Sequence, residues 1–175
     1  MNNTTKRIVI LLETDFRDEE AIYPFYRLQE EENISIEIAT DQKKTAFGKF
    51  GFPMQGTIKL EDLKENDFDC VVIPGGNEGP DRLRMNRDVL NFVMDMYNKN
   101  KLVAAICHGV WIPISAKIMK GKVATCYRAI IDDLQNAGAI YQDEPVVVDK
   151  NIITSRHPRD LAPFVRAIID FLKNK

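Results

Sequence analysis

Three short apolar runs constrain the fold of this chain more than any other feature of its sequence. They read IVILL, CVVI and LVAAI, at residues 8–12, 70–73 and 102–106. Unbroken runs of this length, rich in β-branched residues, suit strands that are buried on both faces in a parallel sheet. Segments with the apolar spacing of helices alternate with them, at residues 19–31, 87–98 and 158–172. This alternation predicts a doubly wound α/β architecture.

The rest of the chain adds smaller elements to this plan. Residues 146–149 and 151–154 flank a short Lys-Asn turn and predict a late hairpin, and residues 47–58 predict an irregular extended excursion. No repeat, low-complexity tract or linker divides the 175 residues, so a single domain over residues 1–175 is expected. Ligands of such sheets bind at the carboxyl ends of the strands. A site is therefore expected in the segments that follow the strands, residues 13–20, 74–81, 107–109 and 125–128.

Composition excludes several classes of function. The net charge of -2 predicts neither nucleic acid nor an anionic membrane as partner. No apolar run reaches the roughly 18–20 residues that span a bilayer, and no apolar stretch precedes residue 7 as a secretory signal would require. The three cysteines are odd in number and far apart, which fits a reducing compartment, so a cytoplasmic protein is expected. Metal-ligand patterns, phosphate loops and dinucleotide fingerprints are lacking, so we expect no cofactor and no metal.

The strongest indication of chemistry is Cys107, which ends an apolar run and is followed by His108 and Gly109. This is the layout of a nucleophile elbow, in which a strained residue projects above the sheet and a glycine permits close packing of strand and helix. The N–H groups at a helix start favour a thiolate and predict a lowered pKa for Cys107. The same N–H groups could hold an oxyanion.

For the other two cysteines and the two histidines, structural roles are considered beside catalytic ones. Cys70 lies within a predicted strand and is interpreted as core, and so is Cys126 at a strand end. His108 could equally face a ligand or be structural, because adjacent residues at an elbow point in different directions. His157 precedes Pro158 and is interpreted as the entry to the last helix.

Several motifs together resemble the ThiJ/PfpI superfamily, and its PfpI-type intracellular protease branch in particular. The superfamily also includes the human parkinsonism-associated deglycase. The resemblance covers nearly the whole chain. The matching stretches are EAIYP from Glu20, VIPGG from Val72, PDRLR from Pro80, AICHG from Ala105, IDD from Ile131, NAG from Asn136, TSR from Thr154 and Asp160-Leu161.

The resemblance implies a three-layer, flavodoxin-like sandwich of the class I glutamine amidotransferase type. It implies Cys107 as the nucleophile, His108 as its catalytic neighbour and Glu20 as an acid beside the cysteine. A buried carboxyl can stay protonated and donate a hydrogen bond to a thiolate. Without the resemblance, Glu20 would be interpreted as an acid at a helix N-terminus.

Further positions follow from the resemblance with less support from the residues themselves. Asp81 would come from a neighbouring subunit to orient the histidine, with Glu78 in reserve because this loop is one residue longer than in near relatives. The active form would then be at least a dimer, with a hexamer as an alternative. The backbone of Gly75 and Gly76 would bind the oxyanion. Two weaker pocket assignments are Tyr127, where the family often has an aromatic residue, and Arg17, where close relatives tend to carry an acid.

The residues support thiolate attack on an electrophilic carbon but do not identify that carbon. The family name favours a peptidase acting through an acyl-enzyme. The alternative is a glutathione-independent glyoxalase or deglycase, in which a 2-oxoaldehyde forms a hemithioacetal. In a third interpretation the protein is no enzyme but a redox-responsive stress or chaperone protein, since exposed thiols of low pKa are readily oxidised. The expected partners are thus a small aldehyde or peptide and further copies of the chain.

Overall fold

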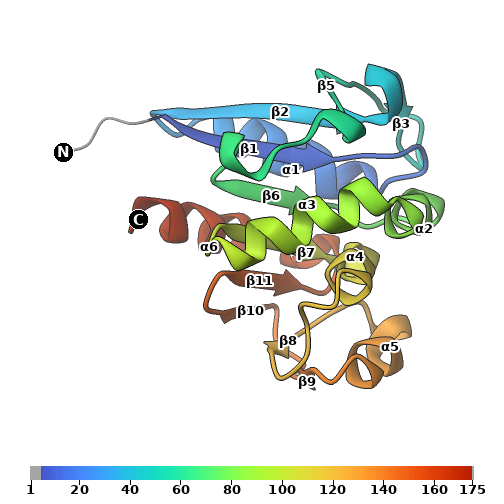
Figure 1. The fold of residues 1–175 in the computed structure, drawn as a ribbon, viewed down its shortest axis with the longest axis vertical. Helices are drawn as coiled ribbons and strands as arrows, with labels where there is room; N and C mark the ends of the chain where they lie inside the picture. The colour runs from blue at the N-terminus through green and yellow to red at the C-terminus, as the bar shows by residue number, and fades with distance from the viewer. Residues whose placement is uncertain (1–4, 175) are drawn as a thin grey trace.

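The computed structural model describes residues 5–174 and centres on a seven-stranded sheet in the order β10-β11-β7-β6-β1-β2-β5 (Figure 1). Neighbouring strands are parallel except β10 and β11, which form an antiparallel hairpin. The sheet strands are β1 (Lys6–Leu11), β2 (Ile34–Thr40), β5 (Ile58–Lys59), β6 (Cys70–Ile73), β7 (Leu102–Ile106), β10 (Val146–Asp149) and β11 (Ile152–Ser155). Two small pairs lie outside it, β3 (Thr45–Phe47) with β4 (Pro53–Gln55), and β8 (Val123–Ala124) with β9 (Ile140–Tyr141).

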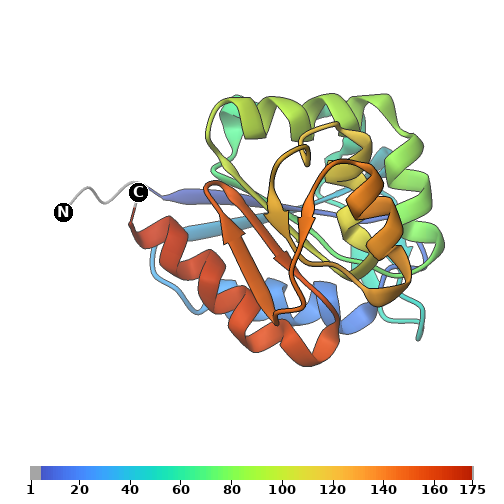
Figure 2. The same cartoon turned by 90° about the horizontal axis from the view of Figure 1, so that it is seen from below.

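Helices cover both faces of the sheet. They are α1 (Asp18–Gln29), α2 (Glu78–Met85), α3 (Arg87–Asn98), α4 (Trp111–Ser115), α5 (Ile131–Asn136) and α6 (Leu161–Lys173). Figure 2 shows α1 and α6 on one side of the strands and α2 and α3 on the other. The fold is therefore a three-layer α/β sandwich.

Successive side chains of a strand point to opposite faces of the sheet, and this alternation accounts for the two helix layers. In β1, Ile8 and Ile10 belong to the apolar cluster shared with α1 and α6, whereas Val9 and Leu11 belong to the cluster shared with α3. All four side chains are fully buried. A strand that is covered on both faces must be apolar at every position, which is why the runs in the sequence are unbroken.

The structure confirms the predicted fold class. The three apolar runs form β1, β6 and β7, and the helical segments form α1, α3 and α6. The late hairpin is β10–β11, and the extended excursion includes the last residue of β3 and the whole of β4. The sequence interpretation missed β2, where Ser35 and Glu37 interrupt the apolar pattern. Within residues 5–174 no helix combines the length and apolarity needed to cross a membrane.

Candidate functional site

Cys107 lies at the sharp turn that the sequence predicted. It follows β7 directly, and its φ of 60° is in the left-handed region, which costs an L-residue roughly 1–2 kcal/mol. The chain continues through the 3₁₀ helix Cys107–Val110 into α4. A Cβ on Gly109 would lie 2.3 Å from the carbonyl oxygen of Ile73 at the end of β6. Glycine is thus required there for the turn to pack against the neighbouring strand.

The Gly75–Gly76 turn after β6 presses against this cysteine. A Cβ on Gly75 would lie 2.7 Å from both the Cβ of Cys107 and Oε2 of Glu20. The N–H of Gly75 donates a 2.7 Å hydrogen bond to that carboxyl oxygen, so it is already engaged. The N–H groups of Gly76 and His108 instead interact with the Cys107 sulfur. Oxyanion binding by Gly75 and Gly76 stays a prediction.

Glu20 reaches the cysteine from α1 and is fully buried. Burial disfavours the charged carboxylate and raises its pKa from 4.5 to about 7, although the N–H of Gly75 and the Cys107 side chain act in the opposite direction. Its Oε1 has no hydrogen-bond partner of good geometry among the described residues. If this carboxyl is protonated, the Cys107 sulfur is therefore the polar atom to which it can donate a hydrogen bond.

The lowered pKa predicted for Cys107 is not what the structure gives. Burial raises the pKa of this thiol, and the negative charge of Glu20 raises it further. The N–H groups of His108 and Gly76 lower it but are outweighed, and the side chain is only 7% exposed. Sulfur and carboxyl therefore titrate as a pair, and a thiolate is favoured only when Glu20 holds a proton.

We expect Glu20→Gln to flatten the pH dependence of stability. Because the folded pKa exceeds the ordinary value, the neutral carboxyl is favoured in the fold. This contribution is complete below pH 4.5 and is lost as the pH rises through about 7. The free energy of unfolding should fall by about 3 kcal/mol more in the unmodified protein than in the variant between about pH 4 and pH 8.

Urea denaturation across this range measures the difference. Glu19→Gln, the same change at the exposed neighbouring position, should leave the pH profile of the unmodified protein in place. Parallel profiles for Glu20→Gln and the unmodified protein would contradict the assignment of a raised pKa to Glu20.

His108 faces the cavity beside the nucleophile. Its Nδ1 lies 3.4 Å from the sulfur of Cys107, and its ring is 4.8 Å from the rings of both Tyr127 and Trp111. Burial lowers the pKa of His108, and the positive charge of Lys49 lowers it further, against the opposing effect of nearby acids. A neutral imidazole can accept the thiol proton, so the geometry suits a proton carrier.

The two acids considered as partners of His108 lie on α2. Asp81 is exposed, and its charge acts on His108 within the same chain, raising its pKa. Glu78 is also exposed and pairs with Arg82. An orienting role for Asp81 across a subunit boundary stays a prediction.

The weaker assignments, Arg17 and Tyr127, both line the cavity around Cys107. Arg17 pairs with Glu19 through a 2.8 Å contact and lies over the ring of Phe50 at 4.7 Å. The sequence interpretation missed Lys49, which also lines this cavity. It is brought there because Gly48 pairs with Phe16, a tertiary contact that no local spacing reveals.

Two hollows with shared lining residues lie at the site. The first, of about 320 Å³, contains Cys107, His108 and Glu20. The second is a cleft of about 790 Å³, and both hollows are lined by Arg17, Tyr127 and Pro158. Among the described residues no cluster of His, Cys, Asp and Glu could hold a metal ion.

The remaining predictions about single residues agree with the structure. Cys70 is fully buried in β6, and Cys126 is 1% exposed in the apolar core. Burial raises the pKa of Cys126 to about 12. His157 directly precedes the turn that leads into α6, as expected for the entry to the last helix.

Known proteins are similar to this chain in both sequence and architecture. The model of the DJ-1/PfpI family matches residues 6–171. "Deglycase PfpI" from Pyrococcus furiosus is 39% identical over 95% of this chain and 99% of its own length. "Putative cysteine protease YraA" from Bacillus subtilis is 38% identical over 97% and 99%. The crystal structure of Drosophila melanogaster DJ-1beta superposes with a TM-score of 0.91 at 25% identity, over 98% of this chain and 92% of that one.

Proposed function

The chain belongs to the DJ-1/PfpI family, and from that premise we propose that Cys107 attacks small 2-oxoaldehydes or the adducts they form with amines. The chain is an enzyme of the PfpI type, and its relatives carry the names deglycase and putative cysteine protease. We place the glyoxalase or deglycase reaction first. This reverses the order expected from the sequence, which favoured a peptidase.

The observation that carries this choice is the small cavity around the sulfur. Cys107 is 7% exposed and faces a hollow of about 320 Å³ shared with Glu20 and His108. A three-carbon 2-oxoaldehyde fits such a space without rearrangement. A peptidase must present an extended chain to the nucleophile, which demands an open groove at the sulfur.

The proposed reaction balances without an oxidant or a cofactor. The sulfur forms a bond to the aldehyde carbon of methylglyoxal, and the carbonyl oxygen takes up a proton to give a hemithioacetal. A proton then leaves this carbon and another joins the neighbouring ketone carbon, so that the first is oxidised as the second is reduced. Water hydrolyses the resulting thioester to lactate and frees the thiol.

Each neighbouring group has a part in these proton movements. His108, 3.4 Å from the sulfur, accepts the thiol proton as the carbon–sulfur bond forms. Glu20, whose pKa of about 7 lets it hold or release a proton near neutral pH, serves the carbon-to-carbon transfer. The backbone at Gly76 contributes an N–H beside the sulfur.

Peptide hydrolysis remains the second candidate. It is supported by the name of the Bacillus subtilis relative and by the cleft of about 790 Å³ that adjoins the cavity. The redox-responsive role is less favoured, because the Cys107 thiol is almost fully buried and so is shielded from oxidants. A cytoplasmic location and self-association to at least a dimer complete the proposal.

A product assay without glutathione tests the proposal. We expect the protein to convert methylglyoxal to lactate, followed by NMR, and to leave a panel of fluorogenic peptides intact. Peptide cleavage without lactate formation would replace the proposal with the peptidase. Activity in neither assay would overturn both and leave the redox-responsive role.

A further inference from the structure

The cleft beside the catalytic cavity is rich in arginine. Arg17, Arg128, Arg156 and Arg159 line its wall, against the acids Glu19 and Asp143. The cleft meets the cavity of Cys107 at Tyr127 and Pro158, which line both. Arg128 directly follows Tyr127, and Arg159 directly follows Pro158. Both arginines are thus one residue away from the junction.

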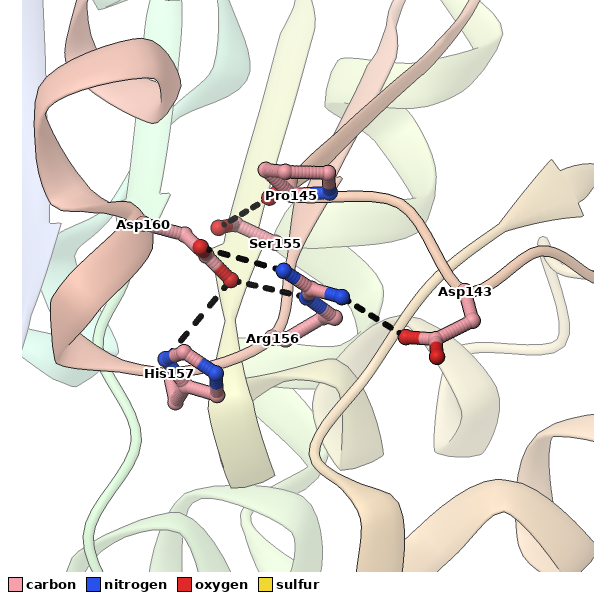
Figure 3. A network of polar contacts seen from close by, with 6 residues as sticks. All are labelled: Asp143, Pro145, Ser155, Arg156, His157 and Asp160. Atoms are coloured by element: carbon pink, nitrogen blue, oxygen red, sulfur yellow. Dashed lines mark hydrogen bonds and ion pairs between the residues drawn. The ribbon is translucent and has the colours of Figure 1, made fainter.

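Two of the four positive charges are already compensated. Arg156 bonds Asp160 through two nitrogens, at 2.9 and 3.3 Å, and bonds Asp143 at 2.8 Å (Figure 3). Arg17 pairs with Glu19 at 2.8 Å. Both acids that line the cleft are therefore engaged, and their arginines form a fixed part of its wall.

Arg128 and Arg159 differ from Arg156 and Arg17 in having no acidic partner within residues 5–174. Both are exposed, and neither has an ion pair with any residue of the part of the chain that the structure describes. Guanidinium groups present several N–H donors in a plane and bind phosphate oxygens in a bidentate manner. Two uncompensated guanidiniums in one cleft suit a dianionic group better than a neutral one.

We propose that Arg128 and Arg159 bind a phosphomonoester on the same molecule whose carbonyl reacts with Cys107. The substrate class is then a phosphorylated carbonyl compound, with its phosphate in the cleft and its reactive carbon in the cavity. Tyr127 and Pro158 line both hollows, and their apolar surfaces suit a short carbon chain between the two. This inference rests on the proposed reaction for the carbonyl end, while the phosphate site stands on the arginines themselves.

Protection of Cys107 from alkylation tests the phosphate site without requiring turnover. Iodoacetamide labelling of Cys107 is followed by mass spectrometry at constant ionic strength, with sn-glycerol 3-phosphate or glycerol as the protecting probe. We expect the phosphate ester to slow labelling and glycerol at the same concentration to have no effect. The double variant Arg128→Gln, Arg159→Gln should need roughly tenfold or more of the ester for half-protection.

Arg87→Gln is the matched control, because Arg87 is an exposed arginine on α3 that lines neither hollow. It should keep the protection of the unmodified protein. Equal protection of all three proteins, or no advantage of the ester over glycerol, would overturn the phosphate site. Failure of the proposed reaction is a separate result, since it appears only in the lactate assay.

Discussion

Cys107→Ala is expected to reduce the turnover of methylglyoxal by roughly 10⁴-fold or more, because no other group can form the carbon–sulfur bond. Cys70 and Cys126 are the other two thiols, and both are packed into the core, although Cys126 also lines the neighbouring cleft. Alanine adds no atoms at position 107, and it bears the same backbone strain of the left-handed conformation as cysteine does. The fold should therefore survive, with a loss of stability of about 1 kcal/mol from the small void.

Cys70→Ala is the matched control for this variant. It also removes a buried free thiol, but from the middle of β6 and away from the cavity. It should lose a similar small amount of stability and keep its turnover. Lactate formation that survives in Cys107→Ala, or that disappears in a folded Cys70→Ala protein, would show that the nucleophile has been wrongly assigned.

Gly109→Ala is expected to destabilise the protein by about 3 kcal/mol or more. The added methyl group would lie 2.3 Å from the carbonyl oxygen of Ile73 and 2.8 Å from that of Pro74. Both are backbone atoms, so they cannot rotate away as a side chain could. Relief requires the elbow to move from the end of β6, which also displaces Cys107 from Glu20, and turnover should fall with stability.

Gly121→Ala separates this clash from the general effect of adding a methyl group. Gly121 has a φ of 73°, and no atom lies within 4 Å of the position of its Cβ. Only the backbone cost of about 1 kcal/mol is expected there. Midpoints of urea denaturation compare the two variants, and equal shifts would contradict the close packing at Gly109.

The fold could be predicted from the sequence where burial is complete. β1, β6 and β7 lie in the middle of the sheet, are covered on both faces and form unbroken apolar runs. β2 was missed because Ser35 is exposed and Glu37 is only half-buried, so its pattern mixes polar and apolar residues. The small β8–β9 pair was missed too, since strands of two residues are too short to show a periodic pattern.

Reasoning from the residues alone predicted the candidate site only at the elbow, whereas the place of Glu20 beside Cys107 was expected from the family resemblance. The elbow at Cys107 is local, and its left-handed backbone follows from the strand-to-helix turn. The raised pKa of Cys107 comes first from burial in the tertiary structure and then from the charge of Glu20, which approaches from a helix far away in sequence, so the local argument gave the opposite direction. The position of Lys49 in the cavity wall likewise depends on a tertiary contact, the pairing of Gly48 with Phe16.

Trapping the adduct on Cys107 tests the central claim most directly. The protein is mixed with ¹³C-labelled methylglyoxal, quenched in acid within the first turnovers, digested and analysed by mass spectrometry. We predict a labelled thioester or hemithioacetal on the peptide that contains Cys107, decaying as labelled lactate appears. Label that accumulates only on lysine or arginine side chains, while lactate still forms, would contradict covalent catalysis by this cysteine.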